Sequence, residues 1–185
     1  PARKLIVIGV TGTNGKTTTV YLITKILEEA AFKVASLSSV NFKIGPKEWP
    51  NKLKMTMPGR FFMQKFLKQA KNSGCQYAVI EVTSEGILQH RHRFLNFNIA
   101  VFTNLSPEHI ERHGSFENYK KAKGKLFQAA KGVHIINLDD KNADYFLQFP
   151  AGKKYTYGLN RGDINTQNVQ FNLKLIGEFN VSNAL

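Results

Sequence analysis

The sequence predicts an α/β protein: a mainly parallel, doubly wound sheet with helices on both faces and a small antiparallel edge ribbon near the C-terminus. Three observations lead to this fold class. Short apolar runs alternate along the chain with segments of helical periodicity. Most of these runs are continuous, which is typical of strands covered on both faces. A glycine-rich loop joins the first apolar run to the first helical segment.

Apolar runs predict strands over residues 5–10, 33–37, 77–82, 99–103, 133–137 and 153–157. Residues 168–175 alternate between polar and apolar more than the other runs, which predicts an antiparallel edge strand. Residues 41–57 contain the turn formers Gly45 and Pro46 and therefore predict a loop or irregular ribbon.

Helical periodicity predicts helices over residues 16–30, 58–72, 116–130 and 140–149, and a further helix that has only begun over 177–185. The second of these begins at Pro58, which suits a first helical turn, and ends before Gly74. Strands that alternate with helices in this way favour a parallel sheet, whose ligands collect beyond the carboxyl ends of the strands.

The segment GVTGTNGKTTT, which begins at Gly9, predicts a phosphate-binding loop, or P-loop. Glycines let backbone N–H groups approach an anion, and the helix N-terminus adds a favourable dipole. Lys16 can reach the outer phosphates, and the Thr17 hydroxyl can bind the accompanying Mg²⁺. The common pattern has a glycine five positions before Gly15, where this chain has Val10. An ordinary strand–turn–helix is the alternative, but strand, glycines, lysine and helix together favour the P-loop.

Composition suits one globular domain, because 185 residues with 42% hydrophobic content can form a sizeable core. Every apolar run is far shorter than the roughly 20 residues that span a membrane, and no signal peptide is visible. The single cysteine, Cys75, excludes an intrachain disulfide and suits a reducing compartment. We therefore expect a cytoplasmic location.

The formal net charge of +13 has three interpretations: attraction to nucleic acid, attraction to small polyanions such as nucleotides, or a solvated surface. The lysines are scattered, with no dense basic run and no aromatic–basic repeat. The surface interpretation, with some steering of anionic ligands, is therefore favoured over nucleic-acid binding.

Three polar residues near predicted strand ends or on a helix could carry chemistry. Glu81 ends the 77–82 strand and could bind Mg²⁺ or orient a water, although a strand-terminal carboxylate can also simply face solvent. His109 lies in a loop and could ligate a metal or accept a proton, or be an ordinary polar residue. Lys123 lies among several lysines whose spacing alone predicts a solvated helix face.

Seven motifs follow one another along nearly the whole chain: GxxGTNGKT from Gly9, EVTS at 81–84, QHR at 89–91, FTNLSxxH at 102–109, HGxxExYxxAKxxLF at 113–127, INxDD at 136–140 and GxFNVSN at 177–183. Together they resemble the central ATPase domain of the Mur ligases, nearest to the MurE branch, the UDP-N-acetylmuramoyl-tripeptide synthetases. That family places its loop glycines where this chain has them, which accounts for Val10.

The resemblance implies an ATP-dependent amide-bond ligase of peptidoglycan precursor synthesis. Such an enzyme activates a UDP-muramoyl-peptide carboxylate as an acyl phosphate, which an amino acid then attacks. ATP and Mg²⁺ are the implied cofactors. The implied catalytic residues are Lys16, Glu81, His109 and Lys123, and the implied metal ligands are Thr17, Glu81, His109 and Lys123, the lysine as a carbamate formed with carbon dioxide. The implied nucleotide-binding residues are Gly12, Thr13, Asn14, Gly15, Lys16, Thr17, Thr18, Asn180 and Asn183, and the implied substrate-binding residues are Thr56, Ser84, Gln89 and Arg91.

The departures from the family pattern fall mainly on the acceptor side. Glu85 stands where the family usually has histidine, and Met55 and Met57 flank Thr56 in its Thr-Thr segment. Ser-Pro-Glu-His, ending at His109, replaces the more common Ser-Arg-Asp-His. Two other functions stay open: a related ligase with another acceptor, such as a folylpolyglutamate or cyanophycin synthetase, and a noncatalytic nucleotide-binding P-loop module.

We expect residues 1–185 to form a single Mur-ligase central domain that binds ATP. The family's N-terminal UDP-binding and C-terminal amino-acid-binding domains are expected to lie outside this chain, so that the isolated domain is a weak or inactive ligase. The expected partners are a UDP-muramoyl-peptide-like substrate and an amino acid. We expect no nucleic acid, no membrane and a monomeric state.

Overall fold

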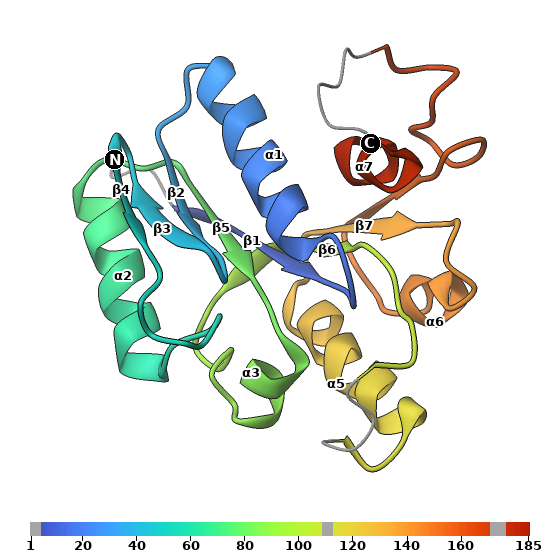
Figure 1. Ribbon diagram of the computed structural model, residues 1–185, viewed down its shortest axis with the longest axis horizontal. Helices are drawn as coiled ribbons and strands as arrows, with labels where there is room; N and C mark the ends of the chain where they lie inside the picture. Colours follow the sequence, from blue (N-terminus) through green and yellow to red (C-terminus); the bar gives the residue numbers. More distant parts are fainter. Residues whose placement is uncertain (1–4, 109–112, 171–176) are drawn as a thin grey trace.

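The computed structural model describes residues 5–108, 113–170 and 177–185, in which eight strands form one sheet (Figure 1). The strands are β1 (Ile6–Thr11), β2 (Val34–Leu37), β3 (Asn41–Ile44), β4 (Lys47–Pro50), β5 (Tyr77–Glu81), β6 (Phe97–Phe102), β7 (Val133–Asn137) and β8 (Lys153–Tyr157). Their order is β4-β3-β2-β5-β1-β6-β7-β8. The six strands from β2 to β8 in this order run parallel, which confirms the predicted fold class.

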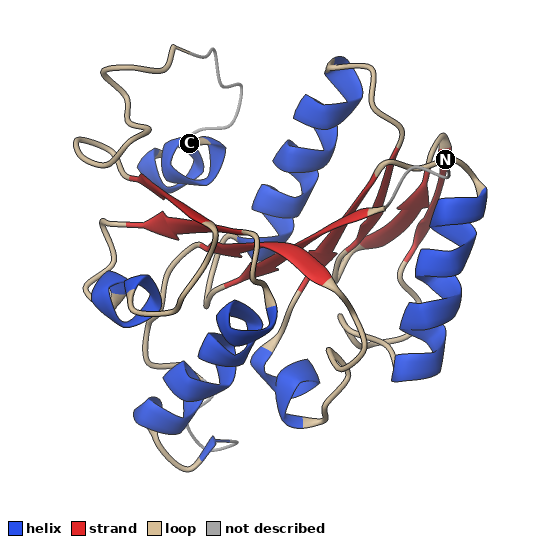
Figure 2. Ribbon diagram, turned by 180° about the vertical axis from the view of Figure 1, so that it is seen from behind, coloured by secondary structure: helices blue, strands red, loops and turns tan. Residues whose placement is uncertain are grey.

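Helices cover both faces of the sheet, as Figure 2 shows. They are α1 (Lys16–Glu29), α2 (Arg60–Asn72), α3 (Ser84–Leu88), α5 (Phe116–Ala129), α6 (Ala143–Leu147) and α7 (Glu178–Ala184). Five of them match predicted helices, with α6 shorter than expected. The short helix α3 is not predicted by periodicity, because five residues span less than two turns.

Two hydrophobic clusters hold these layers together. On one face, Val20 of α1 packs on the sheet residues Val10 and Val79. On the other face, side chains of α2, α3, α5 and α6, such as Phe66 and Leu126, form a larger cluster. Burial of apolar surface on both sides of the parallel strands explains why their sequences read as continuous apolar runs.

The antiparallel edge lies at the other end of the sheet from the one the sequence predicts. β3 and β4 form it, in the segment predicted to be a loop or irregular ribbon. Short connections between β2, β3 and β4 force antiparallel pairing, and Gly45 makes the hairpin turn with φ of 56°. At the C-terminal side, the edge strand β8 is parallel to β7. Residues 168–170 form no strand, and residues 171–175 lie outside the described residues.

The strand registers place the candidate site at one edge of the sheet. In β1, Val10 pairs with Glu81 of β5 and Thr11 pairs with Phe102 of β6. The carboxyl ends of these three central strands therefore lie side by side. Ligands of open parallel sheets bind beyond this edge.

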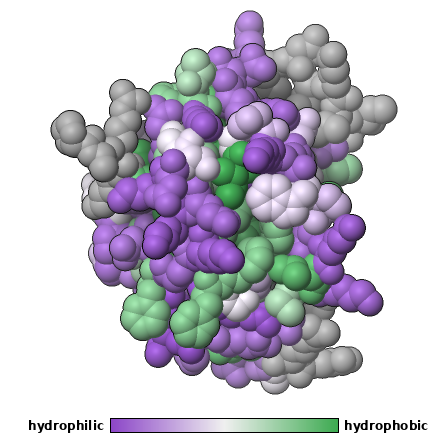
Figure 3. Space-filling view, turned by 90° about the vertical axis from the view of Figure 1, so that its left-hand side faces the viewer, coloured by the Kyte–Doolittle hydropathy of each residue, from purple (hydrophilic) through white to green (hydrophobic). Residues whose placement is uncertain are grey.

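The face over β4 and α2 is mainly hydrophilic with apolar side chains among the polar ones (Figure 3). Trp49 of β4 and Phe61 and Phe62 of α2 are exposed, Phe61 to 92%. In the part of the chain that the structure describes, every helix is too short or too polar to cross a bilayer.

Candidate active site

The predicted P-loop lies between β1 and α1, with Gly15 as the residue that precedes the helix. Gly15 has a φ of 79°, a left-handed conformation that favours glycine. A Cβ atom on Gly15 would lie 2.2 Å from Oδ1 of Asn183, and one on Gly12 would lie 1.9 Å from Oγ1 of Thr103. Close packing thus requires glycine at both positions of the loop.

The unusual glycine spacing has a structural explanation. Val10 is fully buried within β1, so the common pattern's first glycine would fall in the strand and not in the loop. Gly9 is also in β1, where an added Cβ would lie 2.8 Å from Leu126 of α5 and 2.9 Å from Phe97 of β6. Gly9 therefore allows close packing of α5 on the sheet.

The loop is held from outside by the segment that follows β6. The Asn104 side chain accepts from the Asn14 backbone N–H at 2.8 Å and donates to the Asn14 carbonyl at 3.0 Å. Thr103 Oγ1 donates to the same carbonyl at 2.7 Å. Glu108 Oε1 accepts from the Asn14 side-chain amide at 3.2 Å. These contacts within the protein fix the orientation of the P-loop.

Lys16 begins α1 and donates from Nζ to the Thr13 carbonyl at 2.6 Å. Burial lowers the pKa of the Lys16 ammonium, and the negative charges of Glu81 and Glu108 oppose this shift. The ammonium is thus partly desolvated next to the loop, where it is available to a phosphate.

Glu81 and Thr17 are brought together as the sequence predicts. Thr17 Oγ1 donates to Glu81 Oε2 at 2.8 Å. The backbone N–H of Ser39 donates to the same carboxylate oxygen at 2.9 Å, and Ser39 Oγ lies 2.9 Å from Thr17 Oγ1. Glu81 is buried and does not face solvent. Because hydroxyl and carboxylate oxygens are ligands that Mg²⁺ prefers, this donor set fits the metal.

Lys123 lies on the face of α5 that packs on the sheet, although its spacing alone predicts a solvated position. It is only 1% exposed, donates from Nζ to the Gly12 carbonyl at 2.6 Å, and lies 4.4 Å from the ring centre of Tyr119. Burial holds the pKa of Lys123 well below its usual value, the charge of Lys16 lowers it further, and Glu108 and Glu81 oppose the shift. This environment favours the neutral amine.

A cavity of about 440 Å³ joins the two lysines to most of the predicted acceptor residues. Its lining includes Lys16 and Lys123 together with Thr56, Ser84 and Arg91. Gln89, the remaining predicted substrate-binding residue, does not line this cavity. Its side chain accepts a hydrogen bond from Arg91, which does.

The three residues that depart from the family pattern at the predicted acceptor side, Glu85, Met55 and Met57, lie in different environments. Glu85 and Met55 line the same cavity, whereas Met57 is fully buried and uses its carbonyl to accept from Arg91. Arg91 Nη1 also lies 3.7 Å from the Met55 sulfur. Glu85 therefore adds a carboxylate, and Met55 a thioether, to the wall where an acceptor would lie.

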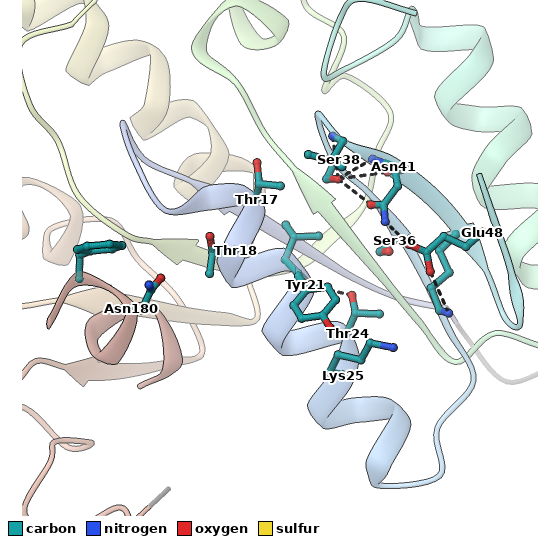
Figure 4. Close-up of a pocket in the computed structure, with 14 residues that line it drawn as sticks. Thr17, Thr18, Tyr21, Thr24, Lys25, Ser36, Ser38, Asn41, Glu48 and Asn180 are labelled. Carbon is teal, nitrogen blue, oxygen red and sulfur yellow. Dashed lines mark hydrogen bonds and ion pairs between the residues drawn. The ribbon is translucent and has the colours of Figure 1, made fainter. Parts of the chain in front are cut away.

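The two predicted asparagines of α7 lie at different places. Asn183 is next to Gly15 of the P-loop. Asn180 lines a second cavity of about 500 Å³ between α1, the β2–β3 region and α7. Figure 4 shows Thr17, Thr18 and Tyr21 along α1, with Asn180 to one side.

The predicted metal ligand His109 lies outside the described residues. Among the described residues, no three His, Cys, Asp or Glu side chains cluster as a metal site. Of the predicted metal ligands, the described residues bring Thr17 and Glu81 within hydrogen-bond distance of each other.

Comparison with known proteins identifies the family. The model of the Mur ligase middle domain matches residues 10–185. The chain belongs to the Mur ligase family. A diaminopimelate ligase of Caldanaerobacter subterraneus subsp. tengcongensis, named UDP-N-acetylmuramoyl-L-alanyl-D-glutamate--2,6-diaminopimelate ligase, is 36% identical over all of this chain and 42% of its own length. The UDP-N-acetylmuramyl-tripeptide synthetase of a Roseiflexus species is 31% identical over all of this chain and 43% of its own length. This Mur ligase chain thus spans about two fifths of the curated relatives it matches.

Solved structures agree with the family. The structure of a UDP-N-acetylmuramoyl-L-alanyl-D-glutamate--2,6-diaminopimelate ligase superposes with a TM-score of 0.84 and 30% identity, over 99% of this chain and 42% of that one. MurF from Acinetobacter baumannii superposes with a TM-score of 0.69 at 19% identity, over 97% of this chain and 40% of that one, which shows the shared fold.

Sequence reasoning missed three residues of this Mur ligase site. Ser39 holds the Glu81 carboxylate through its backbone N–H. Its only signal is its place just after β2, at the carboxyl edge of the sheet. His113 and Tyr119 line the 440 Å³ cavity. Both belong to the HGxxExY motif, but nothing in their spacing predicts contact with Ser84 or with the P-loop.

Proposed function

We propose that this chain is the ATP-binding central domain of a Mur ligase of the MurE type, which joins an amino acid to a UDP-muramoyl-peptide in peptidoglycan precursor synthesis. The observation that carries the proposal is the shared cavity, in which Lys16 of the P-loop and Lys123 of α5 lie with Thr56, Ser84 and Arg91. Phosphate-binding and carboxylate-binding groups next to each other are what acyl phosphate formation requires. The relatives' names support the same reaction class.

In the proposed reaction, an oxygen of the acceptor carboxylate attacks the γ-phosphorus of ATP, and ADP leaves. The amine of the amino acid then attacks the acyl carbon, inorganic phosphate leaves, and the nitrogen loses its proton. Lys16 and the backbone N–H groups of the P-loop would stabilise the charge of the transferring phosphoryl group. Arg91 would hold the acceptor by its carboxylate, with its own guanidinium oriented by Gln89 and the Met57 carbonyl.

Thr17 and Glu81 would hold one Mg²⁺, which supplies neutralisation of phosphate charge. His109 and Lys123 would hold a second. The Lys123 amine, deprotonated in its buried site, would add carbon dioxide and lose a proton to become a carbamate, an anionic oxygen ligand. A buried lysine with a lowered pKa suits this reaction, because only the neutral amine can attack carbon dioxide.

The nucleotide base would lie in the second cavity. Its lining places the Asn180 amide near Thr17 and Thr18, directly beside the phosphate-binding end of α1. The exposed rings of Tyr21 and Phe179 border the same space and offer apolar surface to a planar base.

The remaining features of the proposal follow from the family. The UDP-binding and amino-acid-binding domains would belong to other parts of the full protein, which we expect to act as a monomer. Consumption of ATP and of a UDP-linked precursor supports a cytoplasmic location for the proposed reaction. The acceptor is a small molecule, and the proposed function requires neither nucleic acid nor insertion in a membrane.

The test is acceptor-dependent phosphate release by the full-length protein. With ATP, Mg²⁺ and UDP-muramoyl-dipeptide, the addition of candidate amino acids should give inorganic phosphate and a peptide product. Lys16→Ala should reduce this rate at least about 100-fold, as expected for loss of a group that stabilises transition-state charge. Lys68→Ala, which removes an exposed lysine of α2, is the matched control and should keep wild-type activity.

Other outcomes would replace the proposal. Turnover with a folyl or aspartyl-peptide acceptor, and none with the UDP-muramoyl-peptide, would assign a related ligase. In that case Glu85 and Met55 are the cavity residues to examine first. Stoichiometric ATP binding without phosphate release on any acceptor would assign a noncatalytic nucleotide-binding module.

A further inference from the structure

A buried histidine lies between the acceptor wall and the P-loop. The ring nitrogen Nε2 of His113 is hydrogen-bonded to Oγ of Ser84 at 3.1 Å. Both residues are buried, and both line the 440 Å³ cavity. Ser84 is the first residue of α3, whereas His113 precedes α5, so this bond connects α3 to the segment before α5 at the cavity wall.

His113 is fixed on its other sides. The Asn118 side-chain amide donates to the His113 carbonyl at 3.0 Å, and the Ser115 hydroxyl caps the start of α5 by accepting from the Asn118 N–H at 3.1 Å. The His113 ring meets the Tyr119 ring edge to face, with centroids 4.9 Å apart at 62°. A ring held in this way has little freedom to leave Ser84.

Tyr119 connects His113 to the P-loop. Its hydroxyl lies 3.2 Å from Oγ1 of Thr13, in the P-loop, and its ring centre lies 4.4 Å from Nζ of Lys123. The Thr13 hydroxyl oxygen also accepts from the Ser106 N–H at 3.0 Å. Ser84, His113, Tyr119 and Thr13 thus form one continuous buried wall from the acceptor site to the phosphate site.

We propose that His113 is a positioning residue. It orients the Ser84 hydroxyl toward the acceptor and, through Tyr119, fixes the position of Ser84 relative to the P-loop. The inference rests on the proposed ligase function and adds a residue to it. A serine hydroxyl rotates freely, and a fixed nitrogen partner reduces its choice of orientations. Loss of that partner should weaken acceptor binding, and nucleotide binding should change little.

The test compares variants of the full-length protein in steady-state assays. His113→Phe keeps a flat ring for packing on Tyr119 and removes the bond to Ser84. We expect the KM for the acceptor to rise about tenfold, the cost of one buried hydrogen bond, while the KM for ATP stays within about twofold. His113→Gln, whose amide can reach the position of Nε2, should restore most of the acceptor KM.

His134 offers a matched control. It is also buried, its Nε2 is hydrogen-bonded to the Ala130 carbonyl at 2.7 Å, and its ring meets Phe127 edge to face with centroids 4.9 Å apart. It lies on β7 and does not line the acceptor cavity. His134→Phe therefore also removes a buried histidine hydrogen bond and keeps a flat ring. It should leave the acceptor KM at the wild-type value.

A double-mutant cycle separates positioning from general stability. If His113 acts through Ser84, His113→Phe should add less than about twofold to the acceptor KM of Ser84→Ala, because the bond is already absent. Independent, multiplicative effects would overturn the proposal, as would an unchanged acceptor KM in His113→Phe. If His113→Phe does not fold, the same cycle is measured with His113→Leu, and the same two results decide it.

Failure of this inference is distinguishable from failure of the proposed function. A wild-type protein without acceptor-dependent phosphate release contradicts the ligase proposal itself. A wild-type protein with that activity, in which His113→Phe behaves like His134→Phe, contradicts only the role of His113.

Discussion

Lys123 shows how much of the chemistry of this site depends on one residue's surroundings. On a solvated helix face a lysine is an ordinary cation, but here its Nζ is buried between the Gly12 carbonyl, the Tyr119 ring and the charge of Lys16. Burial and a neighbouring cation both disfavour the ammonium form. The surroundings that make a buried lysine ammonium costly are the ones that would favour the carbamate of the proposed function.

We expect ¹³C-bicarbonate to label Lys123, giving a carbamate carbon signal in NMR spectra of the protein. Because only the neutral amine reacts, and because the pKa of Lys123 is lowered, the labelled fraction should grow as pH rises through that lowered pKa and fall on acidification. Lys123→Met should abolish the signal. Lys121→Met, which removes an exposed lysine of the same helix, should keep it. A signal that survives Lys123→Met would assign the carbamate elsewhere.

Glu81 is a second residue whose role depends on its partners. Its carboxylate accepts from the Thr17 hydroxyl and the Ser39 N–H, both at the carboxyl edge of the sheet. A buried carboxylate needs such hydrogen bonds or a cation to offset desolvation. These contacts hold the carboxylate beside the P-loop, where the proposed function requires a magnesium ligand.

At the scale of elements, the distance between β1 and α5 decides whether Lys123 reaches the P-loop. Gly9 is the point of closest packing, because an added Cβ would lie 2.8 Å from Leu126 and 2.9 Å from Phe97. The strand pairs through Gly9 with Ile80 and Ala100, so it has little freedom to move away. Relief of the clash would therefore displace Leu126, and with it α5, as well as the Phe97 ring of β6.

Gly9→Ala should lower the free energy of unfolding by about 1–3 kcal/mol, the usual cost of overpacking a core, measured by urea denaturation. It should also weaken nucleotide binding, because Lys123 and Tyr119 move with α5. The control is Gly59→Ala, since no atom lies within 4 Å of a Cβ at Gly59, and its φ of −58° suits any residue. This control should cost less than about 1 kcal/mol, because Gly59 precedes α2 and glycine is only modestly preferred there. Equal losses in the two variants would contradict the packing role of Gly9.

At the scale of the whole molecule, the described residues contain a hydrophobic cluster on each face of the sheet and a complete P-loop, whereas the chain spans about two fifths of the length of its relatives. Folding needs the buried hydrophobic clusters and not the P-loop. Ligation, in the proposed function, also needs groups that bind the uridine end of the acceptor and the amino acid.

The 185-residue chain should therefore unfold cooperatively and bind ATP with Mg²⁺ by calorimetry, yet release no phosphate in response to acceptor and amino acid. The net charge of +13 should make ATP association faster at low ionic strength than at high, because long-range attraction is screened by salt. Acceptor-dependent turnover by the chain alone would contradict the proposed division of labour among domains.

Local patterns are enough to predict much of this molecule. The P-loop, the parallel strands and helices α1, α2 and α5 follow from short-range periodicity and turn residues, because these features depend on neighbours within a few positions. The carboxyl edge as the place of the site follows from the parallel sheet. The resemblance to Mur ligases, carried by ordered motifs, is confirmed by the family match over residues 10–185.

Other features were decided only by contacts between residues distant in the chain. The place of the antiparallel pair β3–β4 in the sheet is one of them, because β2 joins the sheet by pairing with β5, which lies far along the chain. The burial of Lys123, the Ser39 bond to Glu81 and the pairing of His113 with Ser84 join segments 29 or more residues apart. Side-chain spacing sets a residue's helix face, but only tertiary packing decides what that face meets, and hence the residue's pKa and chemistry.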